Sequence, residues 1–221
     1  MAIPSLATAS SPFPTSRLYA ILDLGYVSEE NSESAMKSLL AGGANLVQLR
    51  AKHHDLATIE RIARRLIPLC RRAGATFILN DYPILAAALD ADAVHLGQDD
   101  GSLSDARKII GPEKWVGRST HSLDQARAAL AEGFDYIGFG PLFPTPTKAG
   151  RPAIGLEEIA TMEREVGHEI PAFCIGGITR ETLPQVLAAG AARIVIVSAL
   201  LQAENIESAT RAVIATMDLR K

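Results

Sequence analysis

Three polar side chains occur at alternating positions at the end of one short apolar run. They are Gln48, Arg50 and Lys52, in the segment QLRAK. In an extended backbone successive side chains point to opposite faces, so this spacing places all three on one side. A neutral amide, a forked guanidinium and a compact ammonium together suit a diphosphate group. The alternative is a strand end that simply exposes its two cations to solvent.

Two carboxylates follow two other apolar runs. Asp81 comes directly after Asn80, and Asp100 ends the segment HLGQDD. Carboxylate oxygens, completed by water and phosphate oxygens, are the ligands that Mg²⁺ prefers. An Asp just before a helix is also a common helix N-cap, and that interpretation stays open for both residues.

A proline-rich segment, GPLFPTPTKAG at 140–150, follows the apolar run 136–139. Its three prolines and two glycines disfavour a helix and predict a stiff, extended loop. The hydroxyls of Thr145 and Thr147 and the ammonium of Lys148 suit an anionic, phosphorylated group. A surface loop of the same composition can also lack any function, so the place of the loop in the fold has to decide.

The last two apolar runs end in residues that suit backbone binding of a phosphate. Gly177 belongs to a Gly-Gly pair, and Val197 precedes Ser198. Glycine lets the backbone approach a ligand without a Cβ, and successive N–H groups can then cradle an anion. A plain tight turn is the alternative. Another run ends in Ser119-Thr120-His121, whose histidine is a further ligand candidate, whereas His95 lies inside a run and is interpreted as a hydrogen-bonded core histidine.

Short apolar runs and helical segments alternate along the whole chain, and the runs are the expected strands. They lie at 18–23, 45–50, 76–81, 93–98, 114–120, 136–140, 172–177 and 193–199. Helices are expected at 32–41, 55–72, 84–89, from 104 to Gly111, from 122 to Gly133, and at 156–166, 181–189 and 206–217. Eight such units predict a single-domain (β/α)₈ TIM barrel over residues 17–221, with an open doubly wound sheet as the competing fold. Residues 1–16 are expected to form a flexible tail.

Polar residues follow every strand from the second onward, and the carboxyl ends of the strands are where the active site of such a barrel lies. The 221-residue chain is 48% hydrophobic with a net charge of −3, so no basic field indicates nucleic acid or an anionic membrane. No apolar run approaches the ~20 residues of a membrane span. Two cysteines in apolar runs, without metal-ligand spacing, favour reduced thiols in the cytoplasm. A homo-oligomer is compatible with the sequence.

Several segments together resemble the thiamine phosphate synthase family. They are QLRAK at 48–52, ILND at 78–81, HLGQDD at 95–100, GRSTHS at 117–122, DYIGFGPLFPTPTK at 135–148, IGGIT at 175–179 and VSAL at 197–200. The resemblance covers about residues 18–202 in the family's order. It implies that a hydroxymethylpyrimidine diphosphate loses pyrophosphate while the nitrogen of a thiazole phosphate takes its methylene carbon.

The resemblance also implies a role for each candidate residue. Asp81 and Asp100 would bind the Mg²⁺ cofactor, and Ser119 would lie at the pyrimidine. The pyrimidine diphosphate would be bound by Gln48, Arg50, Lys52 and Asn80, with Lys148 on the pyrophosphate. The thiazole phosphate would be bound by Thr145, Thr147, Gly177, Val197 and Ser198. Ser119, Lys148 and Arg50 would be the catalytic residues, with Arg50 and Lys148 stabilising the leaving charge. The family's usual acidic residue is replaced by Ala51, whose side chain should point away from the cations.

Two other functions compete with this one. A thiazole tautomerase of the same fold would not need Lys52, Lys148 and both carboxylates together, and His121 would be its residue to watch. A non-catalytic sensor of phosphorylated ligands is the other alternative, and loss of a metal carboxylate or of Lys148 would have favoured it. All of these residues are present.

Overall fold

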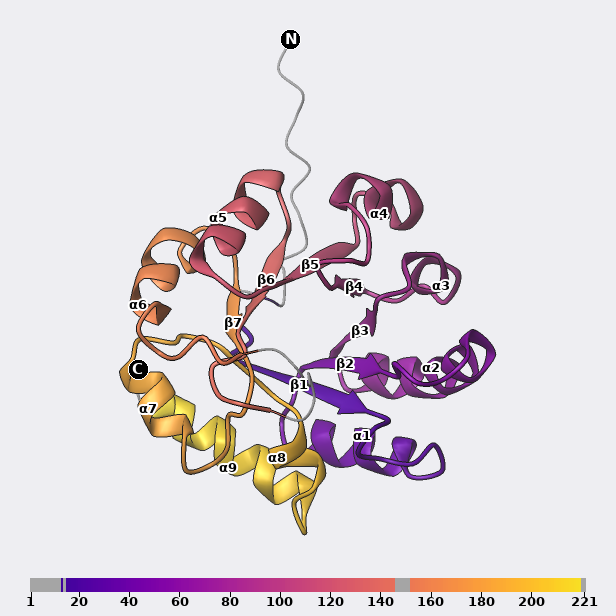
Figure 1. Cartoon of the computed structure of the whole chain (residues 1–221). Coiled ribbons are helices and arrows are strands. Elements are labelled where there is room, and N and C mark those ends of the chain that lie inside the picture. The colour runs from indigo at the N-terminus through magenta and orange to yellow at the C-terminus, as the bar shows by residue number, and fades with distance from the viewer. Residues whose placement is uncertain (1–12, 14, 146–151, 220–221) are drawn as a thin grey trace.

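Eight parallel strands close into one barrel in sequence order, and the helices surround it (Figure 1). The structure is a computed structural model that describes residues 13, 15–145 and 152–219. Each strand pairs with its sequence neighbour, and β1 closes the ring against β8, with Ala20 opposite Ile196. The predicted (β/α)₈ barrel is therefore confirmed, and the open doubly wound sheet is excluded.

The strands are short, from three to six residues. They are β1 Leu18–Asp23, β2 Leu46–Arg50, β3 Thr76–Asn80, β4 Ala93–Leu96, β5 Trp115–Thr120, β6 Tyr136–Phe139, β7 Ala172–Cys174 and β8 Ile194–Ile196. The helices of the described residues include α1 Ser32–Ala41, α2 Leu56–Arg72, α3 Pro83–Ala88, α4 Leu103–Ile110, α5 Leu123–Glu132, α6 Ile159–Met162, α7 Leu183–Ala188, α8 Ser198–Leu201 and α9 Ile206–Asp218.

The structure shortens the last two predicted strands. The seventh, expected to reach Gly177, ends at Cys174, because Gly176 and Gly177 have φ of 101° and 66°, outside the range of a strand. The eighth, expected to reach Ala199, ends at Ile196. The chain then turns into the short helix α8, which the sequence analysis did not predict.

Local signals located other helix ends well. Asp55 caps α2 by accepting from the N–H of Thr58, and Ser122 caps α5 by accepting from the N–H of Gln125. The helix expected at 156–166 differs, because α6 is one turn long and continues as a π-helical segment at Glu163–Gly167.

Two apolar cores follow from the alternation of side chains along the strands. The outer core lies between barrel and helices. The inner one, inside the barrel, is formed by Phe13, Tyr19, Ile21, Leu46, Ile78, Ala93, Tyr136, Phe173 and Val195. The next inward positions of β2, β3, β4 and β5 are Gln48, Asn80, His95 and Ser119, all of which are buried polar residues. The inner face therefore changes from apolar to polar toward the carboxyl ends of the strands.

Phe13 closes this inner core ahead of β1. Its ring centroid lies 4.2 Å from that of Trp115 and 4.5 Å from that of Tyr136, and its side chain is 2% exposed. Ser16 is buried as well. For these two residues the structure differs from the flexible tail expected at 1–16, because an aromatic ring can fill the floor of the barrel.

Within the described ranges 13, 15–145 and 152–219, no helix is long and apolar enough to cross a membrane.

Candidate active site

A cavity lies among the carboxyl ends of the strands. Eight of the residues selected from the sequence line it: Gln48, Arg50, Asn80, Ser119, Thr145, Gly177, Val197 and Ser198. They come from β2, β3 and β5 and from the segments after β6, β7 and β8. The barrel thus collects, in one cavity, residues that lie up to 150 positions apart in the sequence.

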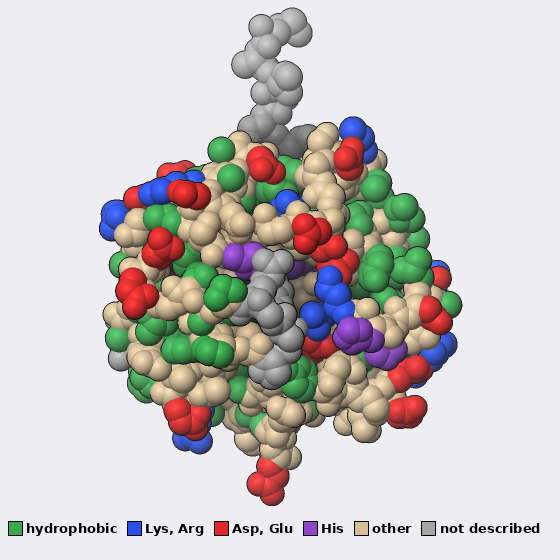
Figure 2. Space-filling view, viewed as in Figure 1, with side chains coloured by type: hydrophobic (Ala, Val, Ile, Leu, Met, Phe, Trp, Pro, Cys, Tyr) green, Lys and Arg blue, Asp and Glu red, His purple; other side chains and the backbone are tan. Residues whose placement is uncertain are grey.

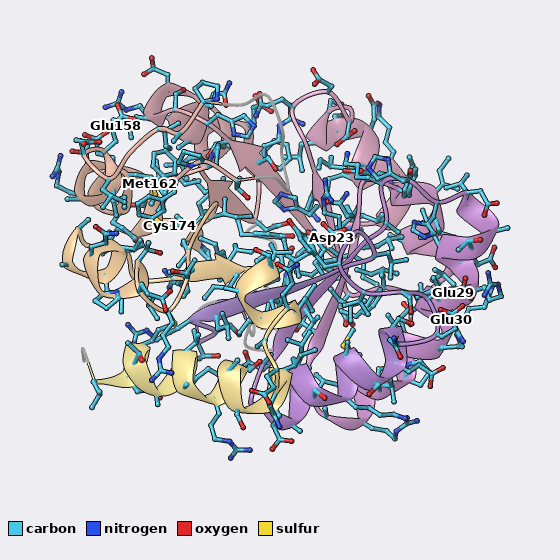
Figure 3. All side chains as sticks on the ribbon, turned by 60° about the horizontal axis from the view of Figure 1, so that its bottom comes forward. Asp23, Glu29, Glu30, Glu158, Met162 and Cys174 are labelled. Atoms are coloured by element: carbon cyan, nitrogen blue, oxygen red, sulfur yellow. The ribbon has the colours of Figure 1, made fainter. Side chains whose placement is uncertain are left out.

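Arg50 is held by a carboxylate that the sequence analysis did not select. Its Nη1 lies 2.5 Å from Oδ2 of Asp23, the last residue of β1, which is 2% exposed. The other Asp23 oxygen accepts from the N–H of Gly25. Asp23 lies in the middle of the barrel, whereas Glu29 and Glu30 lie at its outer edge (Figure 3). The pair fixes one end of the Arg50 guanidinium inside the site. A carboxylate ending the first apolar run was the signal that could have revealed Asp23.

Lys52, Asp81 and Asp100 form a charged cluster beside the cavity. Lys52 Nζ lies 2.6 Å from Asp81 Oδ2, and the carboxyl groups of Asp81 and Asp100 hydrogen bond to each other. Lys52 follows the end of β2 in a turn, so the predicted two-residue spacing on one strand face holds for Gln48 and Arg50 only. Figure 2 shows basic and acidic side chains gathered near the middle of the face that Figure 1 presents.

Neither carboxylate caps a helix. The residue at the N-cap of α3 is Tyr82, and α4 is capped by Ser102, whose hydroxyl accepts from the N–H of Asp105. Asp81 has φ of 72°, which is unusual for any residue other than glycine. Such backbone conformations concentrate at functional sites. The N-cap interpretation of Asp81 and Asp100 is therefore wrong, and the ligand interpretation stays a prediction.

The two carboxyl groups differ in pKa because they differ in burial and in hydrogen-bond partners. Burial, followed by the hydrogen bond with Asp100 and its charge, raises the pKa of Asp81 to about 6, although Lys52 opposes this shift. Partial burial would raise the pKa of Asp100, but hydrogen bonds from Asp81 and from the N–H of Gly97, together with the Lys52 charge, lower it. Two carboxylates this close need a proton or a cation between them.

An arginine of β5 holds the loop that carries Asp100. Arg118 donates to the carbonyl oxygens of Gly97, Gln98 and Gly101, at 2.9 to 3.1 Å. Asp100 Oδ2 accepts from the N–H of Gly97 at 2.7 Å. These contacts set the position of Asp100 relative to Asp81 before any ligand binds.

A divalent cation fits this donor set. Asp81 and Asp100 supply two carboxylates, and no group of three or more His, Cys, Asp or Glu side chains that could hold a metal ion occurs among residues 13, 15–145 and 152–219. Mg²⁺ commonly uses one or two carboxylates and completes its shell with water and substrate phosphate. Two neighbouring carboxyl groups repel each other when both are ionised, and this favours a positive charge between them.

The loops after β6 and β7 pack against each other along their backbones. The N–H of Leu142 donates to the carbonyl of Ile175 at 2.8 Å, and the N–H of Phe143 donates to Gly176 at 3.1 Å. A Cβ on Gly177 would lie 2.6 Å from the Cβ of Phe143, so only glycine fits there. This contact brings Thr145 to the cavity wall opposite Gln48 and Arg50, together with the half-buried Val197 and Ser198.

Ser119 and Gln48 are both held by buried side chains beneath the cavity. His95 Nε2 lies 3.0 Å from Ser119 Oγ, and the Tyr19 hydroxyl donates to Gln48 Oε1 at 2.6 Å. His95 is the hydrogen-bonded core histidine that the sequence predicted, but it also lines the cavity. Its inward position two residues after Ala93 could have indicated this.

The remaining candidates either lie outside the described residues or do not line the cavity. Thr147 and Lys148 lie outside the described residues. His121 hydrogen bonds through Nδ1 with the carbonyl of Gly140, and it does not line the cavity. Ala51 is buried in the outer core, so its side chain points away from the cations, as predicted.

Comparisons with known proteins agree on one family. The family described as thiamine monophosphate synthase matches residues 18–200. A thiamine-phosphate synthase of Chlorobium luteolum is 47% identical over 180 residues, covering 81% of this chain and 84% of that protein. One of Thermus thermophilus is 49% identical over 173 residues, covering 78% and 82%.

A solved structure is similar over nearly the whole chain. It is the thiamine phosphate pyrophosphorylase from Pyrococcus furiosus, with a TM-score of 0.84 and 32% sequence identity. The match covers 95% of this chain and 98% of that one.

Proposed function

The chain belongs to the thiamine monophosphate synthase family. On that premise we propose how its cavity carries out the condensation of a pyrimidine diphosphate with a thiazole phosphate. The substrates are 4-amino-2-methyl-5-hydroxymethylpyrimidine diphosphate and a thiazole phosphate. The thiazole nitrogen forms a bond to the pyrimidine methylene carbon, and the bond from that carbon to the diphosphate oxygen breaks. Thiamine phosphate and pyrophosphate are the products.

The division of the cavity into two half-sites supports this proposal best. One wall carries Gln48, Arg50, Asn80 and Ser119, next to the Lys52–Asp81–Asp100 cluster. The other carries Thr145, Gly177, Val197 and Ser198. The first set suits a heterocycle with a diphosphate, and the second suits a single phosphate bound by hydroxyls and backbone N–H groups. The two reactants would therefore meet inside one cavity.

Leaving-group charge is the main chemical demand of the reaction. Mg²⁺ on Asp81 and Asp100 would neutralise the diphosphate when bound. Arg50 adds a fixed positive charge, aligned by Asp23, and Lys52 can exchange Asp81 for a phosphate oxygen. We assign Lys148 to the departing pyrophosphate on the resemblance alone. The electron-releasing amino group of the pyrimidine stabilises cationic character on the methylene, so no strong general base is needed.

Neither competing function gains support from the site. A tautomerase would have no use for the paired carboxylates, and His121 is hydrogen bonded to the backbone and does not line the cavity.

Cytoplasmic location stays a proposal supported by two buried free cysteines, of which burial raises the pKa of Cys70 to about 12. A homo-oligomer stays a prediction from the sequence.

The deciding experiment supplies purified protein with both phosphorylated halves and Mg²⁺. We expect thiamine phosphate and pyrophosphate in equal amounts, and loss of turnover when EDTA removes the metal. Asp100→Ala should lose most of its activity at low Mg²⁺ and recover part of it at high Mg²⁺. Bound substrates without any product would indicate the sensor function, and rates that do not change across the metal titration would remove Asp100 from the metal site.

A further inference from the structure

The loop that carries Asp100, residues 97–101, is tied to the neighbouring strand β5 by two side chains. The guanidinium of Arg118 on β5 donates to three carbonyl oxygens of this loop, at 2.9 to 3.1 Å. In the opposite direction, Gln98 Nε2 of the loop donates to the carbonyl of Ser119 at 2.6 Å. We call residues 97–101 the Asp100 loop, and Arg118 and Gln98 together the loop clamp.

Inside the Asp100 loop, two hydrogen bonds join Asp100 to Gly97. The N–H of Asp100 donates to the carbonyl of Gly97 at 3.3 Å, and Asp100 Oδ2 accepts from the N–H of Gly97 at 2.7 Å. The same Gly97 carbonyl also accepts from Arg118. A Cβ on Gly97 would lie 2.6 Å from Asp100 Oδ2, so the carboxylate packs directly on the backbone. The direction of the Asp100 carboxylate therefore depends on the backbone that Arg118 holds.

Arg118 is well suited to hold a backbone in one shape. It lies opposite Leu96, the last residue of β4, so it is level with the start of the Asp100 loop. Its Cζ lies 5.3 Å from the centroid of the Phe134 ring, and this cation–π contact orients the guanidinium. A guanidinium presents its donors in one rigid plane, and charged donors form stronger hydrogen bonds than neutral ones. A lysine ammonium on its flexible stem could not fix three carbonyl oxygens in the same way.

The loop clamp maintains an arrangement that electrostatics alone would oppose in the metal-free protein. Asp81 and Asp100 repel each other when both are ionised, so an unrestrained loop would let Asp100 move away into solvent. Lys52 Nζ, 2.6 Å from Asp81 Oδ2, offsets part of this repulsion but does not hold the loop. A clamped loop keeps the two carboxylates together on folding, so that less ordering is left for the moment of metal binding.

We propose that Arg118 and Gln98 are positioning residues for the divalent cation, which hold the Asp100 carboxylate beside Asp81 through the backbone of the Asp100 loop. This inference rests on the proposed function for the place of the cation, but not for any step of the condensation. Residues that orient metal ligands commonly change metal affinity by about 10–100-fold when they are replaced. The loop clamp should therefore set the affinity of the metal-free protein for its cation.

Arg118→Lys is the substitution that separates position from charge. Arg118 donates to Gly101, the residue after Asp100, so its positive charge lies close to the metal site. That charge by itself opposes the binding of a cation, and its removal would raise metal affinity. Lysine keeps the charge but lacks the rigid fork, so a loss of affinity in Arg118→Lys reports the position of the loop. Gln98→Leu is a second, independent variant, because it keeps most of the side-chain volume and removes the donor to Ser119.

The test measures Mn²⁺ binding to the complete chain without substrates, from the EPR signal of the free ion. Wild type should bind one ion, and Arg118→Lys should raise its Kd about tenfold or more. Gln98→Leu should raise the Kd by a smaller factor, since Arg118 still holds the loop. Thermal unfolding in EDTA shows that each variant is folded. In steady-state assays, the half-saturating Mg²⁺ concentration of Arg118→Lys should rise in parallel with its Kd for Mn²⁺.

Arg107→Lys is the matched control. Arg107 of α4 donates to the carbonyl of Lys114 and forms an ion pair with Asp135, so it holds α4 to the start of β5 through bonds outside the Asp100 loop. Its replacement should lower stability, as in Arg118→Lys, while leaving the Kd for Mn²⁺ within about twofold of wild type.

Three results would overturn the inference. They are a wild type that binds no Mn²⁺ without substrates, an unchanged Kd in Arg118→Lys, and an equal rise of the Kd in the control. An unchanged Kd in Gln98→Leu alone would remove Gln98 from the loop clamp. None of these results depends on turnover. Wild type that binds Mn²⁺ but forms no thiamine phosphate would instead remove the proposed function.

Discussion

Asp81 combines three uncommon properties in one residue. Its backbone has positive φ, its carboxyl has a pKa of about 6, and it lies between a lysine and a second carboxylate. The positive φ and the burial of the carboxyl group each cost free energy in the folded protein. Under the proposed function, a divalent cation beside the carboxyl group would offset the second cost, so Asp81 is expected to favour ligand binding over stability.

Asp81→Asn should therefore stabilise the metal-free protein while abolishing most activity. The pKa of Asp81 is raised in the folded state, so folding binds a proton between about pH 4 and 6, and stability is lost as pH rises through that window. An asparagine side chain at this position mimics the protonated carboxyl group of Asp81. The variant should gain about 1–2 kcal/mol at pH 7.5, and almost nothing at pH 4, in urea unfolding with EDTA present.

The control for this change is Asp90→Asn. Asp90 also has positive φ, but it is exposed, and ion pairs with Lys114 and Arg71 lower its pKa. The same substitution there should give no gain in stability at neutral pH. A difference between Asp81→Asn and wild type that does not vary with pH would contradict the assigned cause.

The loops after β6 and β7 act as one element, because their backbones hydrogen bond and touch without intervening side chains. The β6 loop carries Thr145 and the β7 loop carries Gly177, and both residues line the cavity. Close backbone packing makes the position of Thr145 depend on Gly177, a residue of another βα unit. Two half-sites are held at a constant separation in this way.

Gly177→Ala should disturb this contact, and Gly74→Ala is its matched control. The two glycines have nearly equal φ, 66° and 65°, so each substitution incurs about 1 kcal/mol of backbone strain. A Cβ meets Phe143 and Pro144 at Gly177 but nothing within 4 Å at Gly74. Gly177→Ala should lose a further ~1–3 kcal/mol and raise KM for the thiazole phosphate about tenfold.

Thermal unfolding and steady-state kinetics measure the two effects. Gly74→Ala should keep wild-type kinetics, since it lies at the end of α2, far from the cavity residues. Equal losses in the two variants would mean that backbone strain, not loop contact, is the cause.

The molecule as a whole is a barrel with a sealed floor and an open polar mouth. Phe13 is inserted from the segment before β1 and packs on Trp115, Tyr136 and Phe173. The hydroxyl of the same Tyr136 lies 3.3 Å from His95 Nδ1, and His95 Nε2 lies 3.0 Å from Ser119 Oγ in the cavity wall. The packing of the floor and the geometry of the site are therefore parts of one interior.

Phe13→Ala should cost about 3–4 kcal/mol of unfolding free energy, because it empties a ring-sized space that neighbouring side chains cannot fill. The fluorescence of Trp115, the single tryptophan, should shift to longer wavelength as water reaches it. Ile84→Ala is the control, since Ile84 is 74% exposed and its truncation should change stability by less than about 0.5 kcal/mol. A cost below about 1 kcal/mol at Phe13 would show that the floor closes without it.

The sequence by itself determined the eight βα units and eight of the residues that line the cavity, but not α8 or the π-helical segment. Strands buried on both faces read as short apolar runs, and glycine, proline and capping side chains separate them from helices, so eight βα units could be counted. Polar residues at the strand ends then had to meet, because all parallel strands of a barrel point the same way. Gln48 and Arg50 were found by this reasoning, and the resemblance supplied their roles.

Tertiary structure alone decided which distant side chains touch. The pairs Arg50–Asp23, Ser119–His95 and Gln48–Tyr19 each join different strands, and Asp81 and Asp100 come from different loops. Such contacts depend on register, closure and burial, which no local pattern encodes. Residue type can show that a carboxylate could cap or ligate, but only its surroundings in the folded chain set its pKa and its partner.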